Sequence, residues 1–135
     1  MIGDGLMAIF GAPLPLRDPC ASAVAAALAM TAGIAPFNAA RARAGRAPIA
    51  FGIGIASGEV VAGYTGTQQR ATYTCIGDTV NLAARLEAHT KVAGHDILVD
   101  AGTQAAVGNR VAFERMEAVQ FKGKSAPSPV FAVCA

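Results

Sequence analysis

The sequence predicts a single α/β domain, and three features point to this fold class. An alanine-rich helical run follows Asp18, three short strand-like runs fall within residues 48–76, and a second helical pattern starts at Asp78. The 135 residues suffice for one domain, and a composition of 53% hydrophobic and 15% charged residues is typical of a folded chain. We therefore expect one domain over residues 1–135.

The charge balance and the apolar segments restrict the classes of partner. The chain has 11 basic and 9 acidic residues and a net charge of +2. This excess of basic residues is too small for the broad basic face of a nucleic-acid-binding protein. The most apolar stretch, residues 20–37, is rich in alanine with polar, glycine and proline interruptions, so we expect no membrane contact from it. Residues 1–7 lack the features of a signal peptide, so we expect a cytoplasmic location, with the domain on the cytosolic side if the parent protein is membrane-bound.

The cysteines and histidines have no spacing typical of a metal site or a disulfide framework. Cys20, Cys75 and Cys134 are widely separated and odd in number, as expected in a reducing compartment. His89 and His95 are expected to be ordinary surface or helix-end residues.

The N-terminal half is expected to contain a strand followed by a helix. Residues 5–10 form an apolar run before a Gly-Ala-Pro breaker, which predicts a short, largely buried strand. Asp18 precedes a proline, a typical N-cap and first helical residue, so a helix should run to about Gly33. Whether it resumes after Pro36 is left open, and Gly45 is the expected stop.

The next elements are short strands and a second helix. Residues 48–56, 59–64 and 71–76 are predicted to be three successive strands of one sheet. Asp78 should cap a helix that Gly94 closes. The remaining predictions are a strand at residues 96–99, a helix at 102–107, and two closing strands at 111–121 and 129–133.

Gly52, Gly54 and Gly58 form a G-x-G-x-x-x-G pattern inside a strand. A dinucleotide-binding fingerprint needs G-x-G-x-x-G at a turn from strand to helix, so both the spacing and the context differ. We interpret these glycines as positions where another backbone approaches closely.

Residues 73–87 carry the sharpest chemical signal. Asn81 and Arg85 lie four positions apart in the predicted helix, hence about 40° apart on one face. An amide can hold a sugar oxygen while a guanidinium binds phosphoryl oxygens, which suits a phosphate ester. The alternative is an ordinary solvated polar face.

This stretch closely resembles the strand-to-helix signature of class III adenylate/guanylate cyclase catalytic domains. Residues 3–11, 58–63 and 119–124 also match the family, in its order and approximate spacing. The resemblance implies the class III nucleotidyl cyclase fold, an α+β sandwich around a ferredoxin-like βαββαβ core.

The resemblance also assigns roles to individual residues. Asp4 is similar to the second metal-binding aspartate, which holds Mg²⁺ or Mn²⁺, and its alternative is a turn residue. Asn81 and Arg85 resemble the pair that orients the ribose and stabilises charge on the α-phosphate. Lys122 resembles the triphosphate-binding lysine, with a basic β-turn as its alternative. Thr74 stands at the base-reading position, where threonine is similar to a subgroup of adenylate cyclases.

The departures from the family pattern concern the upstream part of the domain. The family's first metal aspartate and its purine-selecting lysine have no counterpart here, so we expect a partial domain without its N-terminal strand and helices. The isolated chain should therefore show little or no turnover, since two metal ions act in the complete domain. The resemblance further implies a head-to-tail homodimer, with Asp4 from one protomer facing Asn81 and Arg85 of the other, and regulatory domains in a larger parent protein.

Three hypotheses for function follow. The first is an adenylate cyclase domain that converts ATP to 3′,5′-cyclic AMP and pyrophosphate in bacterial signalling, with guanylate cyclase as its variant. The second is a non-catalytic dimerisation or nucleotide-sensing module derived from a cyclase. The third is an unrelated ferredoxin-like binding domain, in which Arg85 and Lys122 would not affect nucleotide binding.

Overall fold

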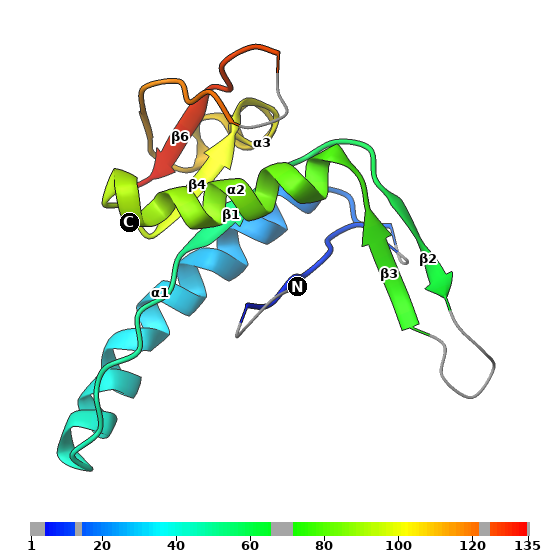
Figure 1. Ribbon diagram of the computed structural model, residues 1–135. Helices are drawn as coiled ribbons and strands as arrows, with labels where there is room; N and C mark the ends of the chain where they lie inside the picture. Colours follow the sequence, from blue (N-terminus) through cyan, green and yellow to red (C-terminus); the bar gives the residue numbers. More distant parts are fainter. Residues whose placement is uncertain (1–4, 13–14, 66–71, 122–124, 135) are drawn as a thin grey trace.

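The computed structural model describes residues 5–12, 15–65, 72–121 and 125–134, and it confirms a mixed α/β fold (Figure 1). The helices are α1 (Pro19–Arg43), α2 (Asp78–Ala93), α3 (Ala101–Val107) and the 3₁₀ turn η1 (Gly108–Arg110). The strands are β1 (Ile53–Ile55), β2 (Val61–Thr65), β3 (Thr72–Ile76), β4 (Ile97–Asp100), β5 (Phe113–Arg115) and β6 (Val130–Val133).

The main sheet has the strand order β1-β4-β6-β5, and the hairpin β2-β3 forms a separate sheet. β1 runs parallel to β4, whereas β6 is antiparallel to both β4 and β5. The hairpin projects away from the main sheet beyond the start of α2 (Figure 1). The three successive strands predicted from the sequence therefore do not form one sheet, because β1 pairs with β4 across the intervening helix while β2 and β3 pair with each other.

The main sheet is covered on both faces by helices. On one face, Val24 and Ala27 of α1 and Val107 of α3 pack with Ile97 and Val99 of β4. On the other face, a second cluster is formed by Leu86, Leu98, Phe121, Val130 and Ala132. Adjacent residues of β4 thus point to opposite helical layers, as the alternation along a strand requires.

Helix α1 begins as predicted but does not end near Gly33. The Asp18 carboxylate accepts a hydrogen bond from the Ala21 amide, with Pro19 as the first helical residue. The helix continues through Pro36, and Gly45 with φ +74° follows its end. Its far half is exposed, which lets the chain tolerate the backbone hydrogen bond that the proline removes.

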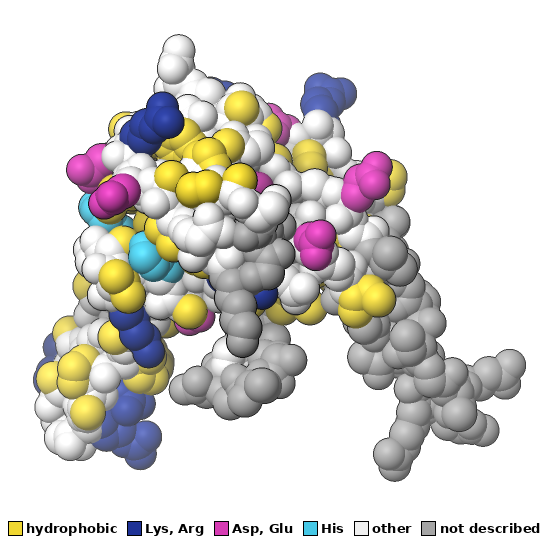
Figure 2. All heavy atoms as spheres, turned by 45° about the horizontal axis from the view of Figure 1, so that its top comes forward, with side chains coloured by type: hydrophobic (Ala, Val, Ile, Leu, Met, Phe, Trp, Pro, Cys, Tyr) yellow, Lys and Arg dark blue, Asp and Glu magenta, His cyan; other side chains and the backbone are white. Residues whose placement is uncertain are grey.

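Helix α1 is not interrupted at Pro36, so it is a longer continuous apolar helix than the sequence predicted. By length and composition alone it could cross a membrane, although core helices pass the same test. Its first half does pack in the core, at Ala23, Val24 and Ala27. In the space-filling view, basic side chains gather at the free end of this helix and are otherwise scattered (Figure 2).

The predicted strand at residues 5–10 is not formed. No strand lies beside this run in the part of the chain that the structure describes, so its backbone has no ladder partner. Leu6 is 84% exposed, in contrast to the buried position expected from its apolar character. The burial predicted for this run is therefore wrong, since Ile9 is half-buried and the other residues of the run are exposed.

Helix α2 ends as predicted and starts one residue earlier than expected. Gly77 with φ +139° is the N-cap, and Asp78 is the first helical residue without a side-chain cap. Its carboxylate still lies at the positive end of the helix dipole. Gly94 adopts the left-handed conformation and its amide donates to the Thr90 carbonyl over 2.9 Å.

The glycines of β1 allow α2 to lie directly on the strand. A Cβ atom at Gly54 would be 2.8 Å from the Cβ of Leu86 and closer still to the backbone of Ala83 and Glu87. A Cβ at Gly52 would collide with the Thr90 side chain. The close approach predicted for these glycines is therefore a contact within one chain.

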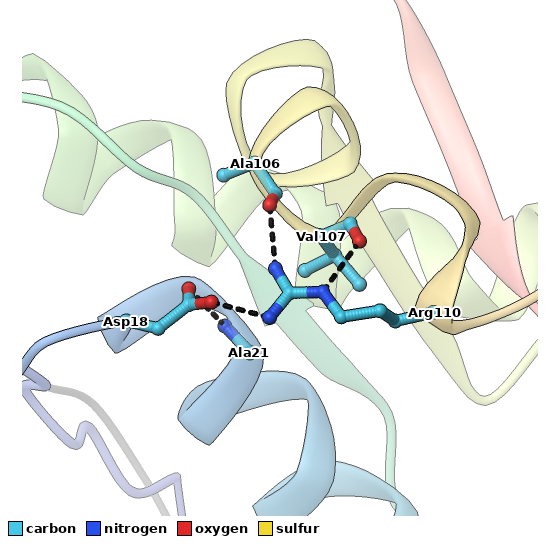
Figure 3. A network of polar contacts seen from close by, with 5 residues as sticks. All are labelled: Asp18, Ala21, Ala106, Val107 and Arg110. Atoms are coloured by element: carbon cyan, nitrogen blue, oxygen red, sulfur yellow. Dashed lines mark hydrogen bonds and ion pairs between the residues drawn. The ribbon is translucent and has the colours of Figure 1, made fainter.

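A charged contact joins the start of α1 to the end of α3 (Figure 3). The Arg110 guanidinium donates to Asp18 and also to the carbonyls of Val107 (2.9 Å) and Ala106 (2.7 Å). The aspartate thus lies at a helix N-terminus and the arginine at a helix C-terminus, where each complements the local dipole. The hydrogen bonds from Arg110 and from the Ala21 amide lower the pKa of Asp18 below its usual value.

We expect Gly54→Ala to destabilise the fold by about 2–3 kcal/mol, because the new methyl group meets backbone atoms of α2 that cannot move independently. Gly33→Ala is the matched control. It lies in α1 with open space around its Cα and should stabilise the protein by roughly 0.5–1 kcal/mol. Urea unfolding followed by circular dichroism measures both. Equal stability of Gly54→Ala and wild type would contradict the close packing.

Replacing Asp18 by Asn should lower the melting temperature at neutral pH, because the amide still accepts from the Ala21 backbone but loses the ion pair with Arg110. A lowered pKa means that the stabilisation is present above the unfolded-state pKa and is lost as pH falls through the folded-state pKa. The difference in melting temperature should therefore shrink in acid. Arg43→Gln, remote from this contact, is the control, and a pH-independent difference would argue against the ion pair.

Candidate functional site

The candidate site is formed by the first two turns of α2. This helix follows β3 of the hairpin directly, with Gly77 as the residue between them. The Thr79 hydroxyl donates to the Glu59 carbonyl over 3.0 Å, and the backbone N–H of Asn81 donates to the Gly77 carbonyl over 3.1 Å. Gly58, with φ +151°, lies against the Thr79 side chain. The start of α2 is therefore tied to the turn that follows β1.

Thr79 is a positioning residue that the sequence analysis missed. A threonine in the first turn of a helix is usually a solvated residue, and nothing in its spacing indicates a partner 20 positions upstream. The positive φ of Gly58 provides the room for this contact, and the glycine itself was the available signal.

Asn81 and Arg85 lie one turn apart on α2, as predicted. Asn81 is exposed and Arg85 is half-buried. No hydrogen bond or ion pair joins either side chain to another part of the chain that the structure describes. Two polar groups on one helical face are therefore available to an external ligand, and an amide beside a guanidinium suits sugar and phosphate oxygens.

The other predicted site residues are placed only in part. Thr74 pairs with Gly63 in the β2-β3 ladder, so its backbone lies just upstream of α2. Asp4 and Lys122 lie outside the described residues, and so do the side chains of Thr74 and Cys75. The structure therefore brings Asn81 and Arg85 together and leaves the remaining assignments as expectations.

Two other features that could suggest chemistry are structural. Buried Asp100 accepts from the amides of Thr103 (2.9 Å) and Ser57 (3.3 Å), which fixes the start of α3 and the end of β1. A cavity of about 380 Å³ is lined by residues of α1 and by Gly94, His95 and Asp96 at the far end of α2 from Asn81. Neither contributes to the Asn81–Arg85 face.

A metal site is not formed by the described residues. Among them, no three histidine, cysteine, aspartate or glutamate side chains come together. Instead, the Nε2 atom of His95 lies 3.5 Å from the Oε2 atom of Glu114, and the ring of His89 packs against Phe121. These residues do not fit a divalent ion, so no chemical step through a metal is derived from them.

Comparison with known proteins identifies the family. The sequence model of the adenylate and guanylate cyclase catalytic domain matches residues 1–132. Adenylate cyclase 1 of Rhizobium meliloti is 31% identical over 131 residues, 97% of this chain. Adenylate cyclase of Anabaena cylindrica is 35% identical over 142 residues, with 98% of this chain covered.

Solved structures of cyclases share the fold. The guanylyl cyclase Cya2 is matched with a TM-score of 0.80 at 33% identity over 92% of this chain, and the adenylyl cyclase CyaB from P. aeruginosa with 0.83 at 26% over 93%. The guanylate cyclase domain of RhGC from Catenaria anguillulae in complex with GTP is matched with 0.78 at 28% over 93%. The chain belongs to the adenylate and guanylate cyclase catalytic domain family, and its fold is that of class III cyclase domains.

The chain corresponds to only part of these proteins. It spans 20% of the Rhizobium relative and 27% of the Anabaena relative. It covers 62% of the Cya2 chain and 65% of the CyaB and RhGC chains in the solved structures.

Proposed function

We propose that this domain is the catalytic domain of an adenylate cyclase and forms 3′,5′-cyclic AMP and pyrophosphate from ATP. The observation that carries the proposal is the pairing of Asn81 and Arg85 on one accessible face of α2, directly after the strand that contains Thr74. Family membership supplies the reaction class, and this face supplies groups that suit a nucleotide.

Each residue has a distinct part in the proposed reaction. Asn81 holds the ribose so that its 3′ oxygen can attack the α-phosphate, and Arg85 stabilises the charge that develops on the phosphoryl oxygens. Lys122 binds the triphosphate through its charge. The family uses divalent metal ions, for which we propose Asp4 as the ligand that this chain contributes.

ATP is the proposed substrate because of Thr74 and the relatives that match the chain. Both curated relatives described above are named adenylate cyclases. The hydroxyl of Thr74 can donate or accept, so it can read the base but discriminates less than a charged group would. Guanylate cyclase activity is the second candidate, since Cya2 and RhGC are guanylyl cyclases with the same fold.

The proposed assembly is a head-to-tail homodimer in the cytoplasm with the reaction centre between protomers. Asp4 of one protomer would face Asn81 and Arg85 of its partner. The free polar face of α2 supports this arrangement, because in the described residues it has no partner within its own chain. We also propose that regulatory domains in the same polypeptide control the activity of this domain.

The test is direct measurement of product. Cyclic AMP and cyclic GMP are quantified by mass spectrometry after incubation with Mn²⁺ and ATP or GTP. The chain is assayed alone and with the segment encoded directly upstream. Formation of cyclic AMP by the extended protein and not by the isolated chain supports the proposal. It also supports the expected low turnover of the isolated chain. Absence of product from both forms, with dimerisation intact, would favour a non-catalytic module.

Asn81→Ala and Arg85→Ala should each lower the rate of the active extended protein by on the order of 10²- to 10³-fold, because each removes a donor directed at the reacting nucleotide. Neither side chain is fully buried, so unfolding free energy should change by less than about 1 kcal/mol. Initial rates and urea unfolding measure the two effects. Exposed Glu87→Ala on the same helix is the control, and full activity of either site variant would refute the assigned roles.

ATP should be turned over faster than GTP, and Thr74→Ala should reduce that preference because the group that reads the base is removed. Competition between ATP and GTP in one reaction gives the ratio of their kcat/KM values. The matched control is Thr72→Ala, two positions earlier in β3. An unchanged ratio in Thr74→Ala would show that another residue sets the selectivity.

A further inference from the structure

Asp100 is a buried carboxylate with two separate backbone partners. It is the last residue of β4 and is 9% exposed. Its Oδ1 atom accepts a hydrogen bond from the Thr103 N–H over 2.9 Å, which caps α3. Its Oδ2 atom accepts from the N–H of Ser57, a residue 43 positions away that follows β1, over 3.3 Å. The second bond is not part of the helix cap, so the carboxylate also holds the chain after β1.

The segment that begins at Ser57 is packed closely against two helices. A Cβ atom at Gly102 of α3 would lie 2.6 Å from the Oγ atom of Ser57. A Cβ atom at Gly58 would lie 2.7 Å from the Oγ1 atom of Thr79 in α2. Residues 57–59, which we call the 57–59 segment, therefore contact the first turns of both α3 and α2.

The Glu59 carbonyl holds the first turn of α2. The Thr79 hydroxyl donates to this carbonyl over 3.0 Å, and a Cβ atom at Gly77 would lie 3.8 Å from the same oxygen. The backbone N–H of Asn81 donates to the Gly77 carbonyl over 3.1 Å. A shift of the Glu59 carbonyl would therefore move the helical turn that carries Asn81.

Asn81 depends on this contact more than Arg85 does. β1 supports α2 at Gly54, where a Cβ atom would collide with the backbone of Ala83 and Glu87. Arg85 lies between those two residues in the sequence, so β1 already fixes its place on the helix. Asn81 precedes both of them and lies in the turn that the 57–59 segment holds. A change in that segment should thus displace Asn81 more than Arg85.

We propose that Asp100 is a positioning residue of the candidate active site. Its Oδ2 atom fixes Ser57, the 57–59 segment carries this constraint to Thr79, and the side-chain amide of Asn81 is thereby held where the ribose binds. The inference rests on the proposed function, because it takes the role of Asn81 from there. Asp100 acts through backbone groups and does not touch the substrate.

The first test separates the two bonds of Asp100 in the active extended protein. Asp100→Asn keeps one side-chain acceptor and replaces the other with an NH2 group, which cannot accept from an N–H. The shorter bond, to Thr103, should keep the oxygen, so the bond to Ser57 is lost. We expect kcat for cyclic AMP formation to fall about 5- to 20-fold because Asn81 is displaced, with KM for ATP changed less than about twofold. Asp100→Ser, whose shorter side chain can still cap α3, should give the same result.

Variants of Thr79 test the other end of the connection. Thr79→Val keeps the shape of the side chain but removes the hydroxyl, and it should lower kcat to a similar extent. Thr79→Ser keeps the hydroxyl and should stay within about twofold of wild type. The matched control is Asp18→Asn, because Asp18 also caps a helix but has Ala21 and Arg110 as its partners. It should lower the melting temperature and leave kcat unchanged.

Double variants distinguish positioning from a general loss of structure. In an Asn81→Ala background, Asp100→Asn should lower kcat no further, because the group that it positions is absent. In an Arg85→Ala background, it should still lower kcat about 5- to 20-fold. An unchanged kcat in Asp100→Asn, whatever its melting temperature, would overturn the inference. So would a full further loss of activity in the Asn81→Ala background.

Failure of the inference is distinguishable from failure of the proposed function. Wild-type protein that forms no cyclic nucleotide refutes the proposed function irrespective of Asp100. Amide hydrogen exchange of the same proteins then decides whether Asp100 positions Asn81. The Asn81 N–H should exchange about 5- to 20-fold faster in Asp100→Asn than in wild type, whereas the Leu86 N–H, where β1 supports the helix, should be unchanged. Equal exchange of the Asn81 N–H in both proteins would overturn the inference as well.

Discussion

Helix α2 rests on β1 so closely that no side chain fits between them at Gly54, and the rest of the site depends on this contact. A Cβ atom there would collide with backbone atoms of the helix. Because the helix cannot move away or roll without losing this fit, its rotation about its own axis is fixed. That rotation buries Leu86, places His89 against Phe121, and leaves Asn81 accessible. A packing constraint in the core thus selects which polar side chains can meet a ligand.

Two further contacts extend that constraint to both ends of the site. At the start of α2, Thr79 binds the Glu59 carbonyl and fills the space left by Gly58. Further along the helix, His89 packs edge to face against Phe121, which links α2 to the chain that precedes β6. The opposite layer is tied separately, through Arg110 and Asp18 between α3 and α1. Both helical layers are therefore anchored by packing on the sheet, and the layer of α1 and α3 has in addition a charged contact that acid weakens.

Much of this arrangement could be predicted from sequence because it depends on local signals. Asp18 with Pro19 marked the start of α1, Gly94 marked the end of α2, and a spacing of four placed Asn81 and Arg85 on one face. The predictions that were wrong concern elements whose partners are distant in the chain. The apolar run at residues 5–10 implied a strand, yet a strand forms only beside another one. β1 was assigned to its sequence neighbours, whereas its partner is β4, reached across α2. Pro36 indicated a break that exposure on one side of α1 made unnecessary.

The same distinction explains why the site residues were easier to find than those that hold them in place. Asn81 and Arg85 could be predicted as candidates because their spacing is helical and residues 73–87 resemble the cyclase signature. His89 and Thr79 act through partners about 30 and 20 positions away, so their side chains have no local signature. His89 was expected to be an ordinary surface or helix-end residue, whereas it is half-buried and packs edge to face against Phe121.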